Sequence, residues 1–121
     1  AQFCSGQMNY SLLGRDVEQD IIPFMNYSGI SMTVWSPLAS GFLSGKYTRE
    51  SLQDPDNRFS GFDLLPFDKE FGFTVVNKIR EIAPSYNASV AQIALAWLLS
   101  KSVVASIIVG ASKIHQLEDN I

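Results

Sequence analysis

Residues 29–37, Gly-Ile-Ser-Met-Thr-Val-Trp-Ser-Pro, predict a strand that begins just after a helix and ends in a turn. Ser31 to Trp35 favours β structure, and the Ser-Pro pair that follows closes the strand. Before it, apolar residues recur at three- and four-residue spacing from Val17 to Met25, and Gly29 stands where a helix C-cap belongs. With another strand expected over residues 7–13, the order predicts a parallel βαβ unit.

The rest of the chain continues this alternation of helices and strands. Ser89 and Gln92 form the pattern of a capping box, followed by an apolar segment that we expect to be a well-buried helix. The predicted elements are a helix over 69–83 ended by Pro84, a helix over 90–99, a fully buried strand over 105–109 and a helix that begins at Lys113. This order predicts an α/β fold with a parallel sheet and right-handed crossovers.

Composition restricts the class of protein. The chain has 121 residues, of which 46% are hydrophobic, enough for the core of one domain. The 12 acidic and 9 basic residues are dispersed, which argues against a nucleic-acid surface or a polybasic membrane patch. Cys4 is the only cysteine, so neither an intrachain disulfide nor a thiolate metal cluster is expected. Without a long apolar run or a signal-peptide pattern, we expect a soluble cytoplasmic protein with no metal site.

Two segments are candidate sites for an anionic ligand. In the long polar loop over 38–65, Lys46 and Arg58 could close over a phosphate, although loop cations are more often simply solvated. In the turn from Gly110 to Ser112, backbone N–H groups and the serine hydroxyl could hold an anion, or Ser112 could only cap the next helix. Trp35 ends a strand, where it could stack on a planar ring or belong to the core.

Three segments together resemble one family. Residues 7–13 (QMNYSLL), 35–47 (WSPLASGFLSGKY) and 110–120 (GASKIHQLEDN) resemble the sixth, seventh and eighth strand-loop segments of the aldo-keto reductases, especially the branch that includes potassium-channel β subunits. The helix over 89–99 also resembles that family. The resemblance implies a (β/α)8 TIM barrel of which residues 1–121 form a single incomplete domain, about the last three β/α units. It also implies hydride transfer from NADPH to an aldehyde or ketone.

The resemblance assigns cofactor contacts position by position. Gln7 resembles the residue that binds the nicotinamide amide, and Trp35 the aromatic residue that stacks on the nicotinamide ring. Two departures from the family pattern are Gly6, where asparagine is usual, and Asp119, where glutamate is common. The full set of expected NADP(H) contacts is Gln7, Trp35, Ser36, Pro37, Leu38, Ala39, Ser40, Gly41, Lys46, Arg58, Gly110, Ser112, Gln116, Asp119 and Asn120.

No segment resembles those that carry the family's catalytic Asp, Tyr, Lys and His, which come from earlier strands. We therefore expect no catalytic residue in this chain. The first interpretation is a piece of an NADP(H)-dependent aldo-keto reductase that cannot turn over alone. The alternatives are a nucleotide-binding or channel-associated regulatory module without catalysis, and an inactive chain that self-associates through uncovered barrel edges.

Overall fold

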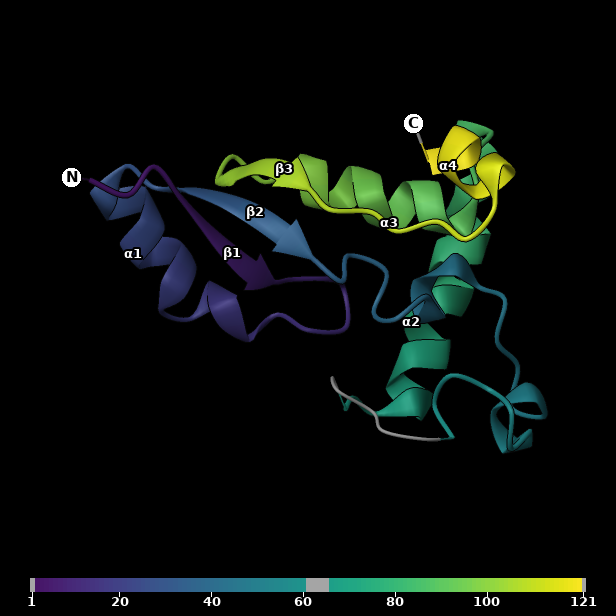
Figure 1. Ribbon diagram of the computed structural model, residues 1–121. Coiled ribbons are helices and arrows are strands. Elements are labelled where there is room, and N and C mark those ends of the chain that lie inside the picture. Colours follow the sequence, from purple (N-terminus) through teal and green to yellow (C-terminus); the bar gives the residue numbers. More distant parts are fainter. Residues whose placement is uncertain (1, 61–65, 121) are drawn as a thin grey trace.

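The computed structural model describes residues 2–60 and 66–120 and contains a three-stranded parallel sheet with helices around it (Figure 1). The strands are β1 (Ser5–Asn9), β2 (Ser31–Trp35) and β3 (Val104–Ile107), in the order β1-β2-β3. Asn9 lies opposite Trp35 in the register of β1 and β2, so both strands end at the same edge of the sheet. The predicted α/β class with parallel strands is confirmed.

Among the described residues, four α-helices accompany the sheet: α1 (Ile21–Ser28), α2 (Lys69–Ile82), α3 (Val90–Leu99) and α4 (Ile114–Asn120). In Figure 1 the strands and α1 lie in one half of the molecule, α2 and the long loop lie in the other, and α3 runs between them. Short 3-10 turns cover residues 16–18, 42–44, 51–53 and 83–86. In the described part of the chain, every helix is too short or too polar to span a bilayer.

The helix ends follow the local signals in the sequence. Gly29 adopts a left-handed conformation with φ of 67°, and its N–H donates to the Met25 carbonyl, as a C-cap glycine does. The predicted capping box at Ser89 and Gln92 is present in full. Helix α2 ends at Ile82, one residue before the predicted end, and Pro84 lies in the 3-10 turn that follows.

Two predicted elements near the N-terminus were wrong in their bounds. The first strand ends at Asn9 instead of continuing to residue 13, because Ser11 and Gly14 pair across a tight turn and the Ser11 hydroxyl accepts the Leu13 N–H at 3.2 Å. The helix expected from Val17 onward is divided into a 3-10 turn and α1. Pro23 falls in the first turn of α1, where its missing N–H removes no helical hydrogen bond.

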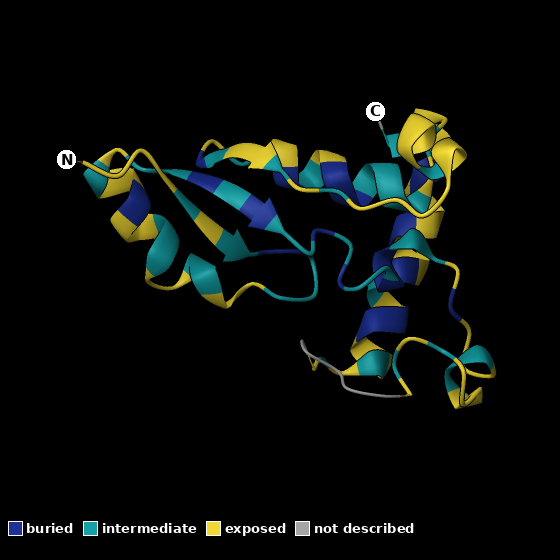
Figure 2. Ribbon diagram, viewed as in Figure 1, coloured by how far each residue is buried: buried dark blue, intermediate teal, exposed yellow. Residues whose placement is uncertain are grey.

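The third strand and the helix before it are more exposed than predicted. Strand β3 covers Val104–Ile107 instead of 105–109, and Ala105 and Ser106 in its middle are exposed. In the described sheet β3 is an edge strand, so it has a neighbouring strand on one side only. Helix α3 is likewise not buried all round, because Leu99 is 62% exposed. Figure 2 shows that burial concentrates on β2, in the middle of the sheet, and on one side of α2.

Buried residues form two clusters, one under the sheet and one under the long loop. The sheet cluster contains Met32, Val34 and Leu98, with α1 contributing Met25. The loop cluster is built around Phe42, which is 1% exposed and packs against α2. The long loop after β2 therefore has an apolar core of its own, which the sequence pattern did not reveal.

The buried side chain of Tyr10 holds the segment after β1 in place. The Tyr10 hydroxyl donates to Glu18 at 2.6 Å, and Arg15 donates to the same carboxylate from Nε and from Nη2, at 3.0 and 2.8 Å. Burial, and then the bond to Glu18, raise the pKa of Tyr10, while the bonds from Arg15 and then Tyr10 lower the pKa of Glu18. The Tyr10 ring also lies 5.2 Å from that of Trp97, so this segment is held against α3.

Candidate functional site

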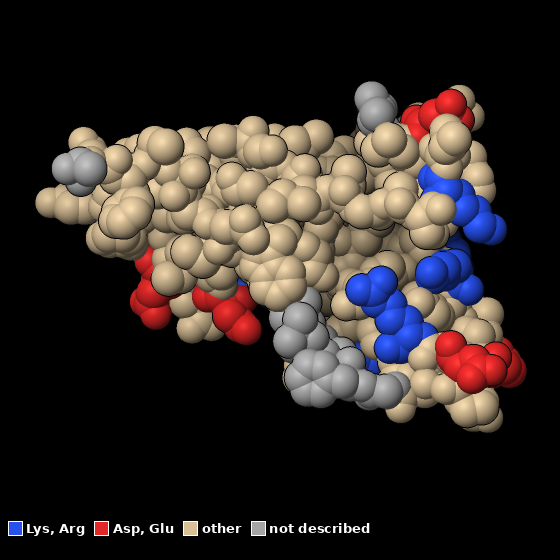
Figure 3. All heavy atoms as spheres, viewed as in Figure 1, with Lys and Arg blue, Asp and Glu red and all other residues tan. Residues whose placement is uncertain are grey.

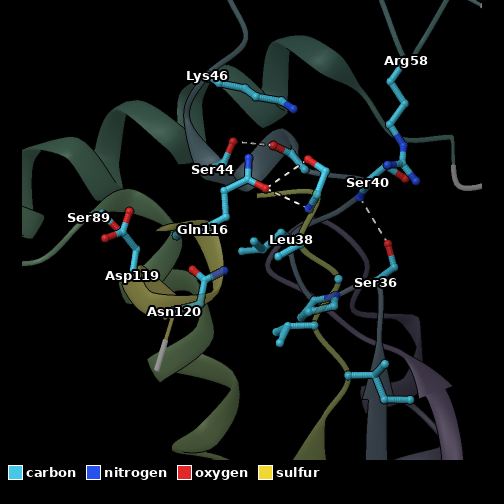
Figure 4. Close-up of a pocket in the computed structure, with 18 of the residues that line it drawn as sticks. Ser36, Leu38, Ser40, Ser44, Lys46, Arg58, Ser89, Gln116, Asp119 and Asn120 are labelled. Carbon is cyan, nitrogen blue, oxygen red and sulfur yellow. Dashed lines mark hydrogen bonds between the residues drawn. The ribbon is translucent and has the colours of Figure 1, made fainter. Parts of the chain in front are cut away.

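A cleft of about 810 Å3 opens at the carboxyl ends of β2 and β3, where parallel α/β folds place their ligands (Figure 4). Its walls come from the loop after β2, the segment from β3 into α4, and the first turn of α3. It brings together most of the residues expected from the sequence: Trp35, Ser36, Pro37, Leu38, Ser40, Gly41, Lys46, Arg58, Gly110, Ser112, Gln116, Asp119 and Asn120.

The turn after β2 has an unusual backbone. Ser36, Ala39 and Ser40 have φ of 53°, 47° and 57°, in the left-handed region that side chains with a Cβ rarely adopt, and Gly41 follows at 90°. Internal hydrogen bonds hold this conformation: the Ser36 hydroxyl accepts the Ser40 N–H at 3.2 Å, and the Ser36 carbonyl accepts the Ala39 N–H at 3.0 Å. Strained backbone of this kind concentrates at ligand sites.

Two cations lie along this wall. Lys46 and Arg58 are both exposed, and Figure 4 shows them on the side of the cleft away from Asp119 and Asn120. A Cβ on Gly41 would lie 3.8 Å from the Lys46 Nζ, so the lysine extends close over the turn. In Figure 3 the Lys and Arg side chains lie over the half of the molecule that holds the long loop and α2, with a group of Asp and Glu side chains beside them. The cleft therefore offers positive charge near a polar turn, a setting suited to an anion.

Phe59 connects the cleft to the loop core. It lines the cleft next to Arg58, and its ring packs edge-on against Phe42 at 5.9 Å and against Tyr47 at 5.1 Å. The loop that carries both cations is thus ordered by its aromatic residues. Sequence reasoning missed Phe59, although the recurrence of aromatic residues in a polar loop was a usable signal.

The opposite wall is formed by the start of α4 and the turn before it. The Gln116 Oε1 accepts hydrogen bonds from the Ser112 N–H at 3.0 Å, the Ser112 hydroxyl at 3.2 Å and the Lys113 N–H at 3.3 Å. The neutral amide oxygen of Gln116 therefore accepts hydrogen bonds from the donors that the sequence analysis assigned to an anion. An anion that bound these donors would have to displace the Gln116 side chain.

Two of the expected residues lie outside the cleft. Gln7 is exposed on β1, opposite Thr33 in the register. Ala39 is 6% exposed and belongs to the loop core instead of lining the cleft. The cleft also contains residues that sequence reasoning did not select: Ser44, Phe59, Ser89, Ala91, Ile108, Val109 and Ala111.

Comparisons with known proteins agree with the fold. The model of the aldo/keto reductase family matches residues 1–121, and the chain belongs to this family of oxidoreductases. It is 37% identical over 119 residues to a rice (Oryza sativa) protein named "Probable voltage-gated potassium channel subunit beta", covering 94% of this chain and 36% of the relative. It is 32% identical over 120 residues to L-glyceraldehyde 3-phosphate reductase of Escherichia coli, covering 95% of this chain and 35% of that enzyme.

A solved structure gives the same result. The aldo-keto reductase AKR11C1 from Bacillus halodurans, in its apo form, superposes with a TM-score of 0.66 at 27% identity, over 99% of this chain and 37% of that one. The chain thus spans about a third of the length of the relatives it matches. The predicted resemblance to the family, including its channel-subunit relatives, is confirmed.

Proposed function

We propose that the cleft binds NADP(H), as the cofactor-holding part of an aldo-keto reductase that reduces aldehydes or ketones. The observation that carries this proposal is the convergence of Lys46, Arg58, the left-handed turn and α4 on one cleft at the carboxyl edge of the sheet. The family uses nicotinamide cofactors and carbonyl substrates. When bound, the nicotinamide supplies the hydride, and this chain supplies binding and orientation.

The residues present suit the parts of this cofactor. The cleft volume of about 810 Å3 is within the range of small-molecule sites. We assign the pyrophosphate to the turn after β2 and to the two cations, since paired phosphates favour backbone N–H groups and flexible positive charge. We assign the nicotinamide to the half-buried ring of Trp35, and the adenosine end to the wall formed by Ser112, Gln116, Asp119 and Asn120.

We also propose that the three strands are the last three of a (β/α)8 barrel. The chain covers about a third of the length of its relatives, and about a third of an eight-stranded barrel contains about three strands. The coverage therefore supports this proposal. In this proposal residues 1–121 belong to one larger domain, and Gln7 reaches the nicotinamide only when the barrel is closed. The reacting acid and its supporting residues come from other strands, so we expect this chain alone to bind without turnover.

We assign the 2'-phosphate, which NADP(H) carries and NAD(H) lacks, to Ser112, and this assignment can be tested by substitution. We expect Ser112→Ala to weaken NADP+ binding about 10-fold, because one donor to a charged oxygen is lost, and to leave NAD+ binding unchanged. Calorimetric titration with each nucleotide measures both constants. Ser102→Ala is the matched control, because Ser102 is exposed and outside the cleft. Equal weakening for NAD+ and NADP+ would contradict the assignment.

A second candidate function follows from the likeness to the channel-subunit relative. In that case the chain is part of a protein that binds nucleotide in order to regulate a partner, and catalysis is not its task. The whole protein separates the two functions: steady aldehyde-dependent oxidation of NADPH supports the reductase. Nucleotide binding with no turnover across a panel of aldehydes and ketones supports the regulatory module.

A further inference from the structure

Gln92 connects the start of α3 to the end of α4. Its Oε1 accepts a hydrogen bond from the Ser89 N–H at 2.8 Å, and its Nε2 donates to the Asp119 carbonyl at 2.6 Å. An amide side chain is required for both bonds, because an ionised carboxylate accepts hydrogen bonds and cannot donate them. The Gln92 side chain therefore connects the capping box of α3 to α4, which forms part of the cleft wall.

Helix α4 has little else to hold it. None of its residues is buried, and Ile114 and Leu117 are 79% and 43% exposed. Within residues 2–60 and 66–120, the bond from Gln92 to Asp119 is the one hydrogen bond that joins α4 to another helix or strand. A single helix of seven residues is not stable on its own, so its orientation depends on such attachments.

We propose that Gln92 is a positioning residue that holds α4 so that Asp119 and Asn120 face the adenosine end of the cofactor. This inference rests on the proposed NADP(H) site. Figure 4 shows Ser89 beside Asp119 and Asn120 on the same side of the cleft, and the hydrogen bond from Gln92 ends on the Asp119 carbonyl. Gln92 itself does not line the cleft, so its effect on binding is transmitted through α4.

Gln92→Glu tests the bridge without removing the cap. Glutamate at this position of a capping box still accepts the Ser89 N–H, so the start of α3 is preserved. The carboxylate cannot donate to Asp119, and we expect the Kd for NADP+ to rise about 10-fold.

Ala96→Glu is the matched control, since it adds the same charge at an exposed position one turn further along α3. An unchanged Kd in Gln92→Glu, or an equal rise of the Kd in Ala96→Glu, would overturn the inference. Hydrogen exchange of α4 amides without nucleotide gives an independent reading: faster exchange in Gln92→Glu supports the tether, and equal rates overturn it. If the original chain does not bind NADP+, the proposed function fails, and exchange alone still decides whether Gln92 holds α4.

Discussion

Phe42→Ala is expected to lower the free energy of unfolding by about 3–5 kcal/mol, the cost of removing a large buried ring and leaving a cavity. Phe42 is 1% exposed and contacts the rings of Tyr47, Phe59, Phe67 and Phe73, at 5.0–5.9 Å between centroids. Because these rings order the loop that carries Lys46 and Arg58, nucleotide binding should weaken together with stability. Urea unfolding followed by circular dichroism measures the free energy.

Phe71→Ala is the matched control for this prediction. Phe71 lies on α2 and is 54% exposed, so the same change there should cost about 1 kcal/mol or less. If the two variants lost equal stability, the loop would not have the aromatic core described above. A loss of stability in Phe42→Ala without any change in nucleotide binding would show that the cleft does not depend on the loop core.

The double variant Lys46→Ala/Arg58→Ala is expected to weaken NADP+ binding about 100-fold, because in the proposed site each cation makes a charge-assisted contact to the pyrophosphate. Binding by the original chain should also weaken as salt is raised, and the double variant should lose most of that dependence. Calorimetric titration over a range of salt concentrations measures both effects. Since both side chains are exposed, stability should change little.

Arg49→Ala/Lys78→Ala makes the same change in net charge outside the cleft and is the control. Both residues form exposed ion pairs on the surface, Arg49 with Glu70 and Lys78 with Glu81. This variant should bind NADP+ within about 2-fold of the original chain, because exposed pairs contribute little and distant charges are screened. A 100-fold loss here as well would mean that overall charge, and not the cleft, governs binding.

Much of the fold could be predicted because its signals are local. The capping box at Ser89 and the C-cap at Gly29 each depend on a few adjacent residues, and both are present. The bounds of β1 were wrong because the tight turn from Ser11 to Gly14 ends the strand, although the apolar residues of this segment are compatible with a longer one. The exposure of β3 depends on which other elements pack against it. The Ile and Val residues of the strand do not carry that information.

Most of the residues of the candidate site could be predicted, but the contacts between them could not. The residues of the cleft follow strands, and parallel strands bring their carboxyl ends to one edge, so Trp35 and Gly110 could be placed together in advance. The contact of Phe59 with Phe42 and the hydrogen bond from Gln92 to Asp119 could not be predicted, because each joins segments far apart in the sequence. The displacement that an anion would impose on Gln116 likewise needed the geometry of its three donors.

The most direct test of NADP(H) binding in the cleft is a titration of the chain with NADPH, followed by tryptophan fluorescence. Trp35 lines the cleft, while Trp97 lies against Tyr10 in the sheet core, so Trp35→Phe should remove the signal and leave the fold intact. Saturable quenching that is lost in Trp35→Phe is the predicted result. No quenching at about 1 mM NADPH, far above the Kd of a specific site, would contradict a cofactor site in this chain.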